Sequence, residues 1–451
     1  ALMYIIILIG IILCVELLRK RSEVYLVDYA CMNYTEEAKT SVEVLLYFMK
    51  GLESVSTKDL MFQTKVFLKS GLGEEAYVPR ETLQYGRHVP EQASLNQVQL
   101  LVVGAVDKLL RKARITPNLI DILIVNSGLF NPTPSLSSRL VEHFKMREDI
   151  KSFHLSGMGC SASLISIDLA KKIFESRNRA NGRRPRYALI VSTELLQQLY
   201  DGNDRSMMVT NCLFRSAGNA ILLSNNPKDK PRCKMQLTHL LRVNIASDDE
   251  AHNVVTVKED EEGVLGAKLH PNLINVATKA IRINMTKLAP KVLPLGELLK
   301  VGVNKLKRRL LKMNHVKAYV PNFKLSFDHF CIHPGSKAVI EGVGKSLALN
   351  DYDIEPSLMG LHRFGNTSCC GIWYELAYIE AKKRLKVGDK VWQIGLGSGF
   401  KCNSAVWTVL RTLDEPILED NPWHDCIHRY PVHGDLSNLP HVIRALQLVL
   451  E

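Results

Sequence analysis

The residue whose type and setting most clearly favour chemistry is Cys160, in the segment Ser156-Gly157-Met158-Gly159-Cys160. A strand-like stretch precedes this segment and an apolar helical pattern follows it, so the sulfur is expected at or near a helix N-terminus. There the helix dipole and free N–H groups favour the thiolate, which is the nucleophilic form of cysteine. Gly157 and Gly159 would allow a tight turn and the close approach of a substrate. The segment predicts a nucleophile, with a buried structural cysteine as the alternative.

A histidine and an asparagine elsewhere in the chain could complete a nucleophilic site. His333 follows the strand-like run LSFDHFCI, and Pro334-Gly335 turns the chain directly after it, which leaves the histidine at a strand end. Asn366 lies in the polar loop 362–368, before another apolar helical pattern. A cysteine with a remote His and Asn is a recognised catalytic set. Taken alone, such a histidine is more often a core residue with satisfied hydrogen bonds.

Metal and nucleotide sites are the competing interpretations of other motifs. His329 and His333 are four residues apart, but the glutamate of HExxH is missing and the segment is expected on a strand. His424 and His428 have the same spacing, without a fuller zinc pattern. The run GLGSGF at 395–400 lacks the third glycine of the dinucleotide fingerprint, so close backbone packing is expected there. We therefore expect no metal and no bound cofactor.

Strands and helices alternate around these residues. Strand-like apolar runs bounded by turn residues occur at 122–125, 187–192 and 391–394. Helical patterns separate them, at 95–111, 162–174, 336–349 and 372–384. This alternation predicts an α/β fold with buried strands.

A faint internal duplication is also present. Cys160 precedes a helix and then the strand beginning at Tyr187, a separation of 27 residues (187 − 160). Asn366 precedes a helix and then the strand beginning at Val391, a separation of 25 residues (391 − 366). Two half-domains that meet at a shared site would explain this match, as would two unrelated α/β units. The boundary is expected near residues 224–232, where Pro and charged residues interrupt the pattern.

Composition limits the class of protein. The chain has 451 residues, with 46% hydrophobic and 23% charged, which favours a large globular fold over disorder. The net charge of +12 suits nucleic acid, an anionic membrane or a polyanionic substrate. No zinc-finger, RNP-like or basic-zipper pattern supports nucleic acid. Ten Cys without a CxxC pair indicate free thiols in a reducing compartment.

The first residues form a separate element. Residues 1–18 are an almost unbroken apolar run whose only charge is Glu16, and the basic residues 19–21 follow at once. At 1.5 Å per residue the run just reaches the length of a membrane span, and the basic end should stay cytoplasmic. A signal-peptide core would need a preceding basic segment and a cleavage site. The run predicts a transmembrane helix with the rest of the chain in the cytosol.

Two basic stretches remain. Residues 177–186 are expected to form a solvated loop before a strand. Residues 300–312 combine basic side chains with apolar residues at helical spacing: Leu299, Val303, Leu306 and Leu310 beside Lys305, Lys307, Arg308 and Arg309. Such a helix would fit a lipid surface, with an ordinary exposed helix as the alternative.

Blocks along nearly the whole chain resemble the plant 3-ketoacyl-CoA synthases, the condensing enzymes of very-long-chain fatty acid elongation. They are VYLVDYAC (24–31), NPTPSLSS (131–138), SFHLSGMGCSASLISIDLAK (152–171), NDRSMMVTNCLFR (203–215), FCIHPGSKAVIEGVG (330–344), HRFGNTS (362–368), WYELAYIEAK (373–382) and VWQIGLGSGFKCNSAVW (391–407). The resemblance implies a thiolase-like αβαβα fold of two duplicated halves, which we assign to 19–228 and 229–451 after the transmembrane helix at 1–18. It also implies an endoplasmic-reticulum membrane location, with another span ahead of Ala1.

The resemblance further implies roles for single residues. The family's Cys–His–Asn triad falls on Cys160, His333 and Asn366. Cys160 would accept a long acyl chain from acyl-CoA as a thioester. His333 and Asn366 would bind the thioester oxygen of malonyl-CoA and stabilise the enolate formed on decarboxylation. The carbanion would then attack the acyl-thioester, giving 3-ketoacyl-CoA that is longer by two carbons.

Other matched positions are expected to assist. His329 and His362 correspond to family histidines with supporting roles, and Phe214 and Gly397 are expected at the substrate pocket. Phe214 occupies the place of an aromatic residue that gates the pocket in chalcone-synthase-like enzymes. The implied partners are acyl-CoA and malonyl-CoA, membrane lipid, other elongase subunits and a second copy of the chain.

Four positions depart from the family's pattern. Asn244 stands where a His is usual, and Ser163 replaces a Gly beside the nucleophile. Residues 334–336 read PGS instead of Ala-Gly-Gly, and residues 369–371 read CCG instead of a Ser-rich run. Three hypotheses therefore stay open: an elongase condensing enzyme, which leads; a non-catalytic membrane-bound partner that binds acyl-CoA; and a thiolase or polyketide-type enzyme with another acyl-CoA.

Overall fold

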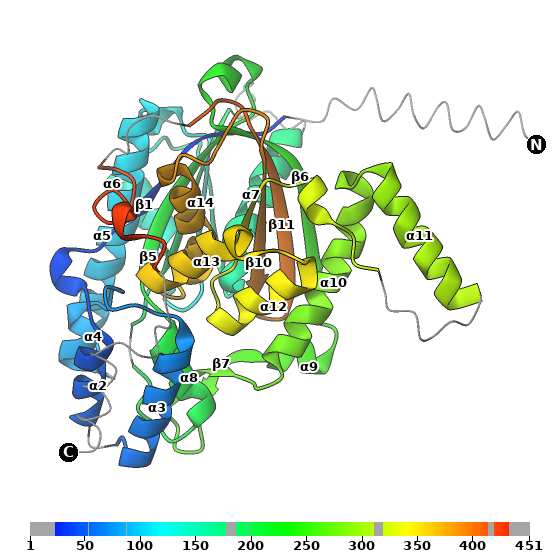
Figure 1. Ribbon diagram of the computed structural model, residues 1–451. Coiled ribbons are helices and arrows are strands. Elements are labelled where there is room, and N and C mark those ends of the chain that lie inside the picture. Colours follow the sequence, from blue (N-terminus) through cyan, green and yellow to red (C-terminus); the bar gives the residue numbers. More distant parts are fainter. Residues whose placement is uncertain are drawn as a thin grey trace, which may run out of the picture.

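The computed structural model describes residues 23–52, 54–86, 88–176, 186–197, 199–310, 319–413 and 419–432 (Figure 1). The predicted transmembrane helix at 1–18 and most of the basic loop, 177–185, lie outside these ranges. Within them, no helix is both long enough and apolar enough to cross a bilayer.

A nine-stranded sheet runs through the molecule in the order β3-β2-β4-β5-β1-β6-β11-β10-β9. The predicted strands at 122–125, 187–192 and 391–394 fall inside β2, β4 and β10. A separate hairpin joins β7 and β8. The strands are β1 (Tyr25–Met32), β2 (Ile122–Ser127), β3 (Lys151–Ser156), β4 (Tyr187–Glu194), β5 (Ala217–Ser224), β6 (Met235–Asn244), β7 (Val255–Glu259), β8 (Leu265–Leu269), β9 (His329–Ile332), β10 (Lys390–Gly397) and β11 (Lys401–Val409).

Helices cover both faces of this sheet, and some of them contact strands from both of its ends. The predicted helical patterns correspond to α5, α7, α12 and α14. The helices are α2 (Val42–Lys50), α3 (Thr57–Ser70), α4 (Arg80–Tyr85), α5 (Glu91–Ala113), α6 (Leu136–His143), α7 (Ala162–Glu175), α8 (Arg205–Leu213), α9 (Asp249–Asn253), α10 (Leu273–Val292), α11 (Leu295–Leu310), α12 (Lys337–Leu347), α13 (Asp351–Phe364) and α14 (Gly371–Ala381).

Three hydrophobic clusters define the layers. The first places α5 and α6 against β1, β2, β4 and β5, and the second places α10 and α12 against β9, β10 and β11. The third contains α7 and α14, which contact strands from both ends of the sheet and so occupy the middle of the molecule (Figure 1). Burial of apolar side chains on both sides of the strands holds these layers together.

The pairing of strands repeats in the two parts of the sheet. β5 pairs antiparallel with β1 and with β4, and β4 pairs parallel with β2. In the second part β11 pairs antiparallel with β6 and with β10, and β10 pairs parallel with β9. This repetition is what a duplication would produce, and the boundary between residues 228 and 229 stays a prediction.

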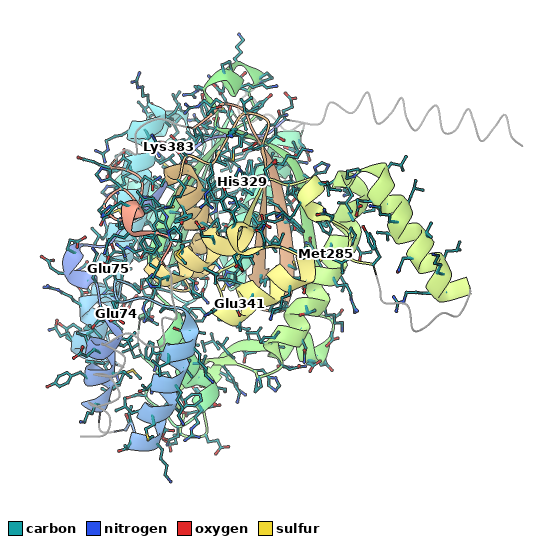
Figure 2. The ribbon with its side chains drawn as sticks, in the orientation of Figure 1. Glu74, Glu75, Met285, His329, Glu341 and Lys383 are labelled. Atoms are coloured by element: carbon teal, nitrogen blue, oxygen red, sulfur yellow. The ribbon has the colours of Figure 1, made fainter. Side chains whose placement is uncertain are left out.

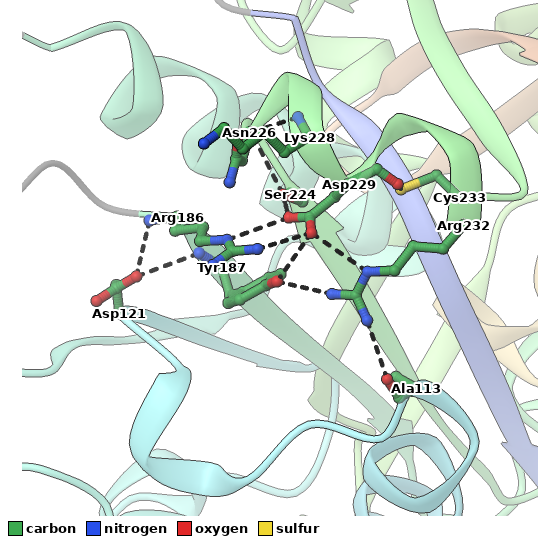
Figure 3. A network of polar contacts seen from close by, with 10 residues as sticks. All are labelled: Ala113, Asp121, Arg186, Tyr187, Ser224, Asn226, Lys228, Asp229, Arg232 and Cys233. Atoms are coloured by element: carbon green, nitrogen blue, oxygen red, sulfur yellow. Dashed lines mark hydrogen bonds and ion pairs between the residues drawn. The ribbon is translucent and has the colours of Figure 1, made fainter.

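A polar network orders the segment where that boundary is expected (Figure 3). The buried Asp229 accepts hydrogen bonds from Arg186 (2.7 Å), from the Ser224 hydroxyl (2.6 Å) and from Arg232 (3.2 Å). The Tyr187 hydroxyl donates a fourth, at 3.2 Å. Burial acts to raise the pKa of Asp229, but these donors and the arginine charges outweigh burial and lower it. The segment therefore forms an ordered 3-10 helix, η4 (Pro227–Arg232), tied to β4 and β5.

Candidate active site

Cys160 lies in the 3-10 segment η3 (Gly159–Ser161), between β3 and α7. The structure thus places its sulfur just before the N-terminus of α7, as predicted. Gly157 and Gly159 both have positive φ, 64° and 69°, a backbone conformation that L side chains rarely adopt. A Cβ atom at Gly159 would also lie 2.5 Å from the backbone nitrogen of Ser398, so only glycine fits beside the nucleophile.

The surroundings of Cys160 keep its thiol protonated. The residue is part-exposed, and desolvation of its sulfur by the atoms packed around it raises the pKa of the thiol to about 12. A hydrogen bond with Ser368 acts in the opposite direction, while the charge of Glu194 raises the pKa further. The prediction that the helix end favours the thiolate is therefore wrong for the resting site, because loss of solvation outweighs the helix N-terminus.

His333 follows directly after β9 and is buried, with 5% of its surface exposed. Its backbone N–H donates to the carbonyl of Ile394 (2.9 Å), and the N–H of Gly335 donates back to the His333 carbonyl (2.8 Å), which closes a tight turn. Burial lowers the pKa of the imidazole to about 4, so the ring is neutral near pH 7. Its Nδ1 has no hydrogen-bond partner within the described part of the chain.

Asn366 is fixed through both its backbone and its side chain. Its N–H donates to the Leu213 carbonyl and its carbonyl accepts from the N–H of Arg215, both at 2.9 Å. In the side chain, Oδ1 accepts from the N–H of Ser368 (3.0 Å) and Nδ2 donates to the carbonyl of Gly335 (3.3 Å). The amide of Asn366 therefore lies next to the turn that carries His333.

Ser368 links the predicted residues into one site. Its hydroxyl interacts with the thiol of Cys160, and its N–H binds the side chain of Asn366. Asn366 in turn contacts Gly335, where a Cβ atom would lie 3.2 Å from Nε2 of His333. The structure thus brings Cys160, His333 and Asn366 together, from elements that are far apart in the sequence.

Two residues of this site, Ser368 and Glu194, are not among those predicted from the sequence. Ser368 also interacts with Glu194, a buried carboxyl at the end of β4 whose pKa burial raises. Glu194 accepts a hydrogen bond from the N–H of Leu129 at 2.9 Å. A carboxyl after an apolar strand is ordinarily exposed, so the sequence carried no signal for its burial. The positive φ of Ser368, 54°, is likewise a feature of the folded chain alone.

The two histidines expected to support the site lie outside this network. His329 (labelled in Figure 2) begins β9. Its Nε2 is 2.9 Å from Oδ2 of Asp389. His333 lies four positions further along the chain, about 13 Å away at the usual rise of a strand. His362, in the last turn of α13, has its Nδ1 3.2 Å from the Tyr430 hydroxyl. Both histidines connect elements around the site, and their supporting roles stay predictions.

The two residues expected at the substrate pocket have different positions. The backbone of Phe214 pairs with that of Asn366, and its side chain is part-buried beside the site. Gly397 packs instead behind the nucleophile, because a Cβ atom there would lie 2.7 Å from the Ser161 hydroxyl and 3.1 Å from the Met158 carbonyl. This agrees with the close backbone packing predicted for residues 395–400.

The departures from the family's pattern also have positions in the structure. A Cβ atom at Gly371 would lie 2.7 Å from Cδ of Pro334, so these two departures fit each other. Ser163 is fully buried on α7. Asn244 is exposed at the end of β6, where its Oδ1 accepts from the N–H of Ala246 (3.0 Å). Among the described residues, no group of three His, Cys, Asp or Glu could hold a metal ion.

Comparison with protein families finds two matches along the chain. Residues 15–310 match the family described as FAE1/Type III polyketide synthase-like protein. Residues 324–409 match the family described as 3-Oxoacyl-[acyl-carrier-protein (ACP)] synthase III C terminal.

Curated proteins include relatives that are similar over almost the whole chain. 3-Ketoacyl-CoA synthase 16 of Arabidopsis thaliana is 46% identical over 430 residues, which cover 93% of this chain and 85% of that protein. 3-Ketoacyl-CoA synthase 8 of Arabidopsis thaliana is 44% identical over 431 residues, which cover 93% of this chain and 87% of that protein.

Solved structures with the same fold are more distant in sequence. The C-terminal type III polyketide synthase domain of Steely1 from Dictyostelium has a TM-score of 0.63 at 13% identity. The fungal type III polyketide synthase ORAS has a TM-score of 0.61 at 16% identity. Each match covers 86% of this chain and 99% of the other. These matches confirm the predicted α/β fold of the thiolase-like kind.

Proposed function

The chain belongs to the 3-ketoacyl-CoA synthases, and from this premise we propose that it condenses malonyl-CoA with a long-chain acyl-CoA. The products are 3-ketoacyl-CoA, CO2 and CoA. The observation that carries the proposal is the set of contacts through Ser368 and Gly335 that joins Cys160, His333 and Asn366.

In the first step, Cys160 takes the acyl group from acyl-CoA. The sulfur attacks the thioester carbon, the bond between that carbon and the sulfur of CoA breaks, and CoA leaves with the thiol proton as HS-CoA. Because burial keeps the thiol protonated, this proton has to move during the reaction. His333 is the base that we assign to the transfer, since its Nδ1 has no hydrogen-bond partner among the described residues and can accept a proton.

In the second step, malonyl-CoA supplies the carbon nucleophile. The thioester oxygen accepts hydrogen bonds from the imidazole of His333 and from the amide of Asn366, whose Nδ2 carries a second hydrogen besides the one donated to the carbonyl of Gly335. Loss of CO2 leaves an enolate on that oxygen, which these neutral donors stabilise. The enolate carbon attacks the acyl carbonyl, the bond to Cys160 breaks, and the released thiolate takes up one proton from water.

The same burial that raises the pKa of Cys160 would protect its thioester. Reduced solvation of the sulfur would slow hydrolysis of the acyl intermediate before malonyl-CoA arrives. A protonated resting thiol is therefore compatible with a two-step condensation.

We also propose that the enzyme is held in the endoplasmic-reticulum membrane by a transmembrane helix at residues 1–18, with the catalytic part in the cytosol. The apolar run and the basic residues 19–21 support this orientation. Other elongase subunits and a second copy of the chain are the proposed partners. Carbonate extraction of microsomes from the full chain and from a chain lacking residues 1–18 would test the anchor.

Elongation assays in microsomes test the proposed reaction. Labelled malonyl-CoA and a panel of acyl-CoAs are supplied to the parent chain and to Cys160→Ala at matched expression. We expect two-carbon-longer products from the parent and none above background from the variant, because no thioester forms without the thiol. Absence of product from both, with full-length chain in the membrane, would contradict the proposal and favour a non-catalytic acyl-CoA-binding partner.

A further inference from the structure

Helix α11 presents an apolar stripe to solvent. Its large aliphatic residues lie at helical spacing and are strongly exposed: Leu295 72%, Leu299 61%, Val303 51% and Leu306 54%. With 3.6 residues per turn, all four fall on one face of the helix. Figure 1 shows α11 projecting from the body of the molecule, so this face is accessible in the described chain.

The opposite face of α11 attaches the helix to the protein. The buried Glu297 accepts hydrogen bonds from the Tyr319 hydroxyl (2.8 Å) and the N–H of Asn322 (2.9 Å). Two turns further on, the side chain of Asn304 accepts from the N–H of Tyr319 at 3.1 Å. Helices of globular proteins normally bury the apolar face and expose the polar one. In α11 the polar contacts face inward and the apolar stripe faces outward.

Basic residues border the stripe on both sides. By helical spacing, Lys300 and Lys307 lie along one side of it, and Lys305 and Arg309 lie along the other. The helix has a single acidic residue, Glu297, which is buried and paired with Lys300 at 2.7 Å. A surface that covers the stripe would therefore meet basic side chains along both edges of it, which favours an anionic surface.

We propose that α11 lies flat on an anionic membrane surface, with its aliphatic stripe among the acyl chains and its basic residues at the lipid phosphates. Burial of exposed aliphatic side chains and attraction to anionic headgroups both favour this position. The proposal depends on neither the condensation reaction nor the helix proposed for residues 1–18. It would place the body of the enzyme at the membrane surface, where long acyl-CoA molecules partition.

A second copy of the chain fits this surface less well. A symmetric contact would bring two stripes together and also place the basic residues of each helix beside those of the other. Like charges held close together in an interface are unfavourable. An anionic lipid surface covers the same aliphatic side chains and also neutralises the basic ones.

Tryptophan quenching by lipid tests the position of α11. All four tryptophans of the chain are fully buried: Trp373, Trp392, Trp407 and Trp423. The variant Leu299→Trp therefore adds the one indole that a membrane could reach. The matched control is Val387→Trp, because Val387 is 60% exposed in the loop after α14. Lys383, four residues earlier, lies on the side of the molecule away from α11 (Figure 2).

Full-length proteins are reconstituted in vesicles of phosphatidylcholine and phosphatidylserine, with or without bromine on the acyl chains. We expect bromine to reduce the added emission of Leu299→Trp by about twofold and to leave that of Val387→Trp unchanged. Combining Leu299→Trp with Lys305→Glu, Lys307→Glu and Arg309→Glu should abolish the quenching while circular dichroism stays that of the parent.

Three outcomes would overturn the proposal. Emission from Leu299→Trp that bromine does not change would show that lipid does not reach the stripe. Equal quenching in both tryptophan variants would show general contact with the vesicle. Emission that is shielded from water and varies with protein concentration, but not with bromine, would indicate a second copy. Flotation of the vesicles separately reports the anchor, and the elongation assay separately reports the activity.

Discussion

At the residue scale, Ser368 occupies a position that few other residue types would support. Its hydroxyl interacts with Cys160 and Glu194, while its N–H binds the side chain of Asn366. Its φ of 54° lies in the left-handed region, which costs an L residue about 1 kcal/mol. These three interactions hold this conformation, as is common for strained residues at functional sites.

The variant Ser368→Ala separates the hydroxyl from the backbone N–H. The hydrogen bond from Ser368 lowers the pKa of Cys160, so its removal should raise that pKa further and slow acylation. Loss of one such bond corresponds to about a tenfold slower transfer. Single-turnover acylation with labelled acyl-CoA, measured across pH, checks this, and the pH at which the rate rises should move upward.

The matched variant is Ser368→Gly, which lacks the hydroxyl but tolerates positive φ. It should acylate as slowly as Ser368→Ala. Its free energy of unfolding, measured with denaturant, should exceed that of Ser368→Ala by about 1 kcal/mol. Acylation at the parent rate in both variants would contradict the role of the hydroxyl.

At the scale of elements, two departures from the family's pattern meet at one contact. Pro334 lies in the turn after β9, and Gly371 is the first residue of α14. Because Gly371 has no side chain, the proline ring can approach the start of the helix closely. Pro334 directly follows His333, and Gly371 begins the helix five residues after Asn366. The positions of both side chains therefore depend on how the two elements pack.

The contact between Pro334 and Gly371 predicts that substitutions at the two positions have non-additive effects on stability and activity. Gly371→Ser would place a Cβ atom 2.7 Å from Cδ of Pro334, so the turn or the helix would have to move. Overpacking of this kind costs about 1–3 kcal/mol of stability, and we expect decarboxylation of malonyl-CoA to slow about tenfold. Pro334→Ala in the same chain should restore both. Effects of the single variants that simply add in the double variant would show that the two residues are not coupled.

The elements that could be predicted from sequence are those whose pattern is local. β2, β4 and β10 read as continuous apolar runs because they are buried on both faces. β6 has exposed and part-exposed residues along its length and carries no such run, so the sequence analysis did not place it. The local settings of Cys160, His333 and Asn366 make them candidates, and the resemblance assigns them to one triad. The contact between Ser368 and Cys160 instead depends on the packing of η3 (Gly159–Ser161) against η6 (Ser368–Cys370). No local pattern records such a contact.

At the scale of the whole molecule, buried titratable groups set the pH range in which the fold is stable. Glu375, on α14, is fully buried; it accepts a hydrogen bond from the Ser357 hydroxyl (2.7 Å), which itself accepts from the N–H of Ile332 (2.9 Å). Burial raises the pKa of Glu375 well above its ordinary value. Burial lowers the pKa of His333 to about 4. The two residues therefore limit stability at opposite ends of the pH scale.

The sign of each contribution follows from which state binds the proton more tightly. The folded chain holds the Glu375 proton more tightly than the unfolded chain, so this stabilising contribution is complete below the unfolded pKa and is lost as pH rises through the folded one. For His333 the contribution is complete above the unfolded pKa near 6.5 and is lost as pH falls toward about 4. Between the unfolded pKa of the carboxyl, near 4.5, and that of the imidazole, near 6.5, the two contributions change in opposite directions, so these two groups favour stability most in this interval.

The variant Glu375→Gln tests the alkaline side of this range. Glutamine cannot ionise, so the unfolding free energy of the variant should decrease less steeply above pH 7 than that of the parent. Its amide adds a contribution that does not depend on pH, so the comparison concerns the slopes of denaturant midpoints measured at several pH values. The exposed Glu37→Gln is the matched control and should follow the parent. Parallel curves for the parent and Glu375→Gln would mean that another group causes the alkaline loss, because the only ionisable difference between the two chains is this carboxyl.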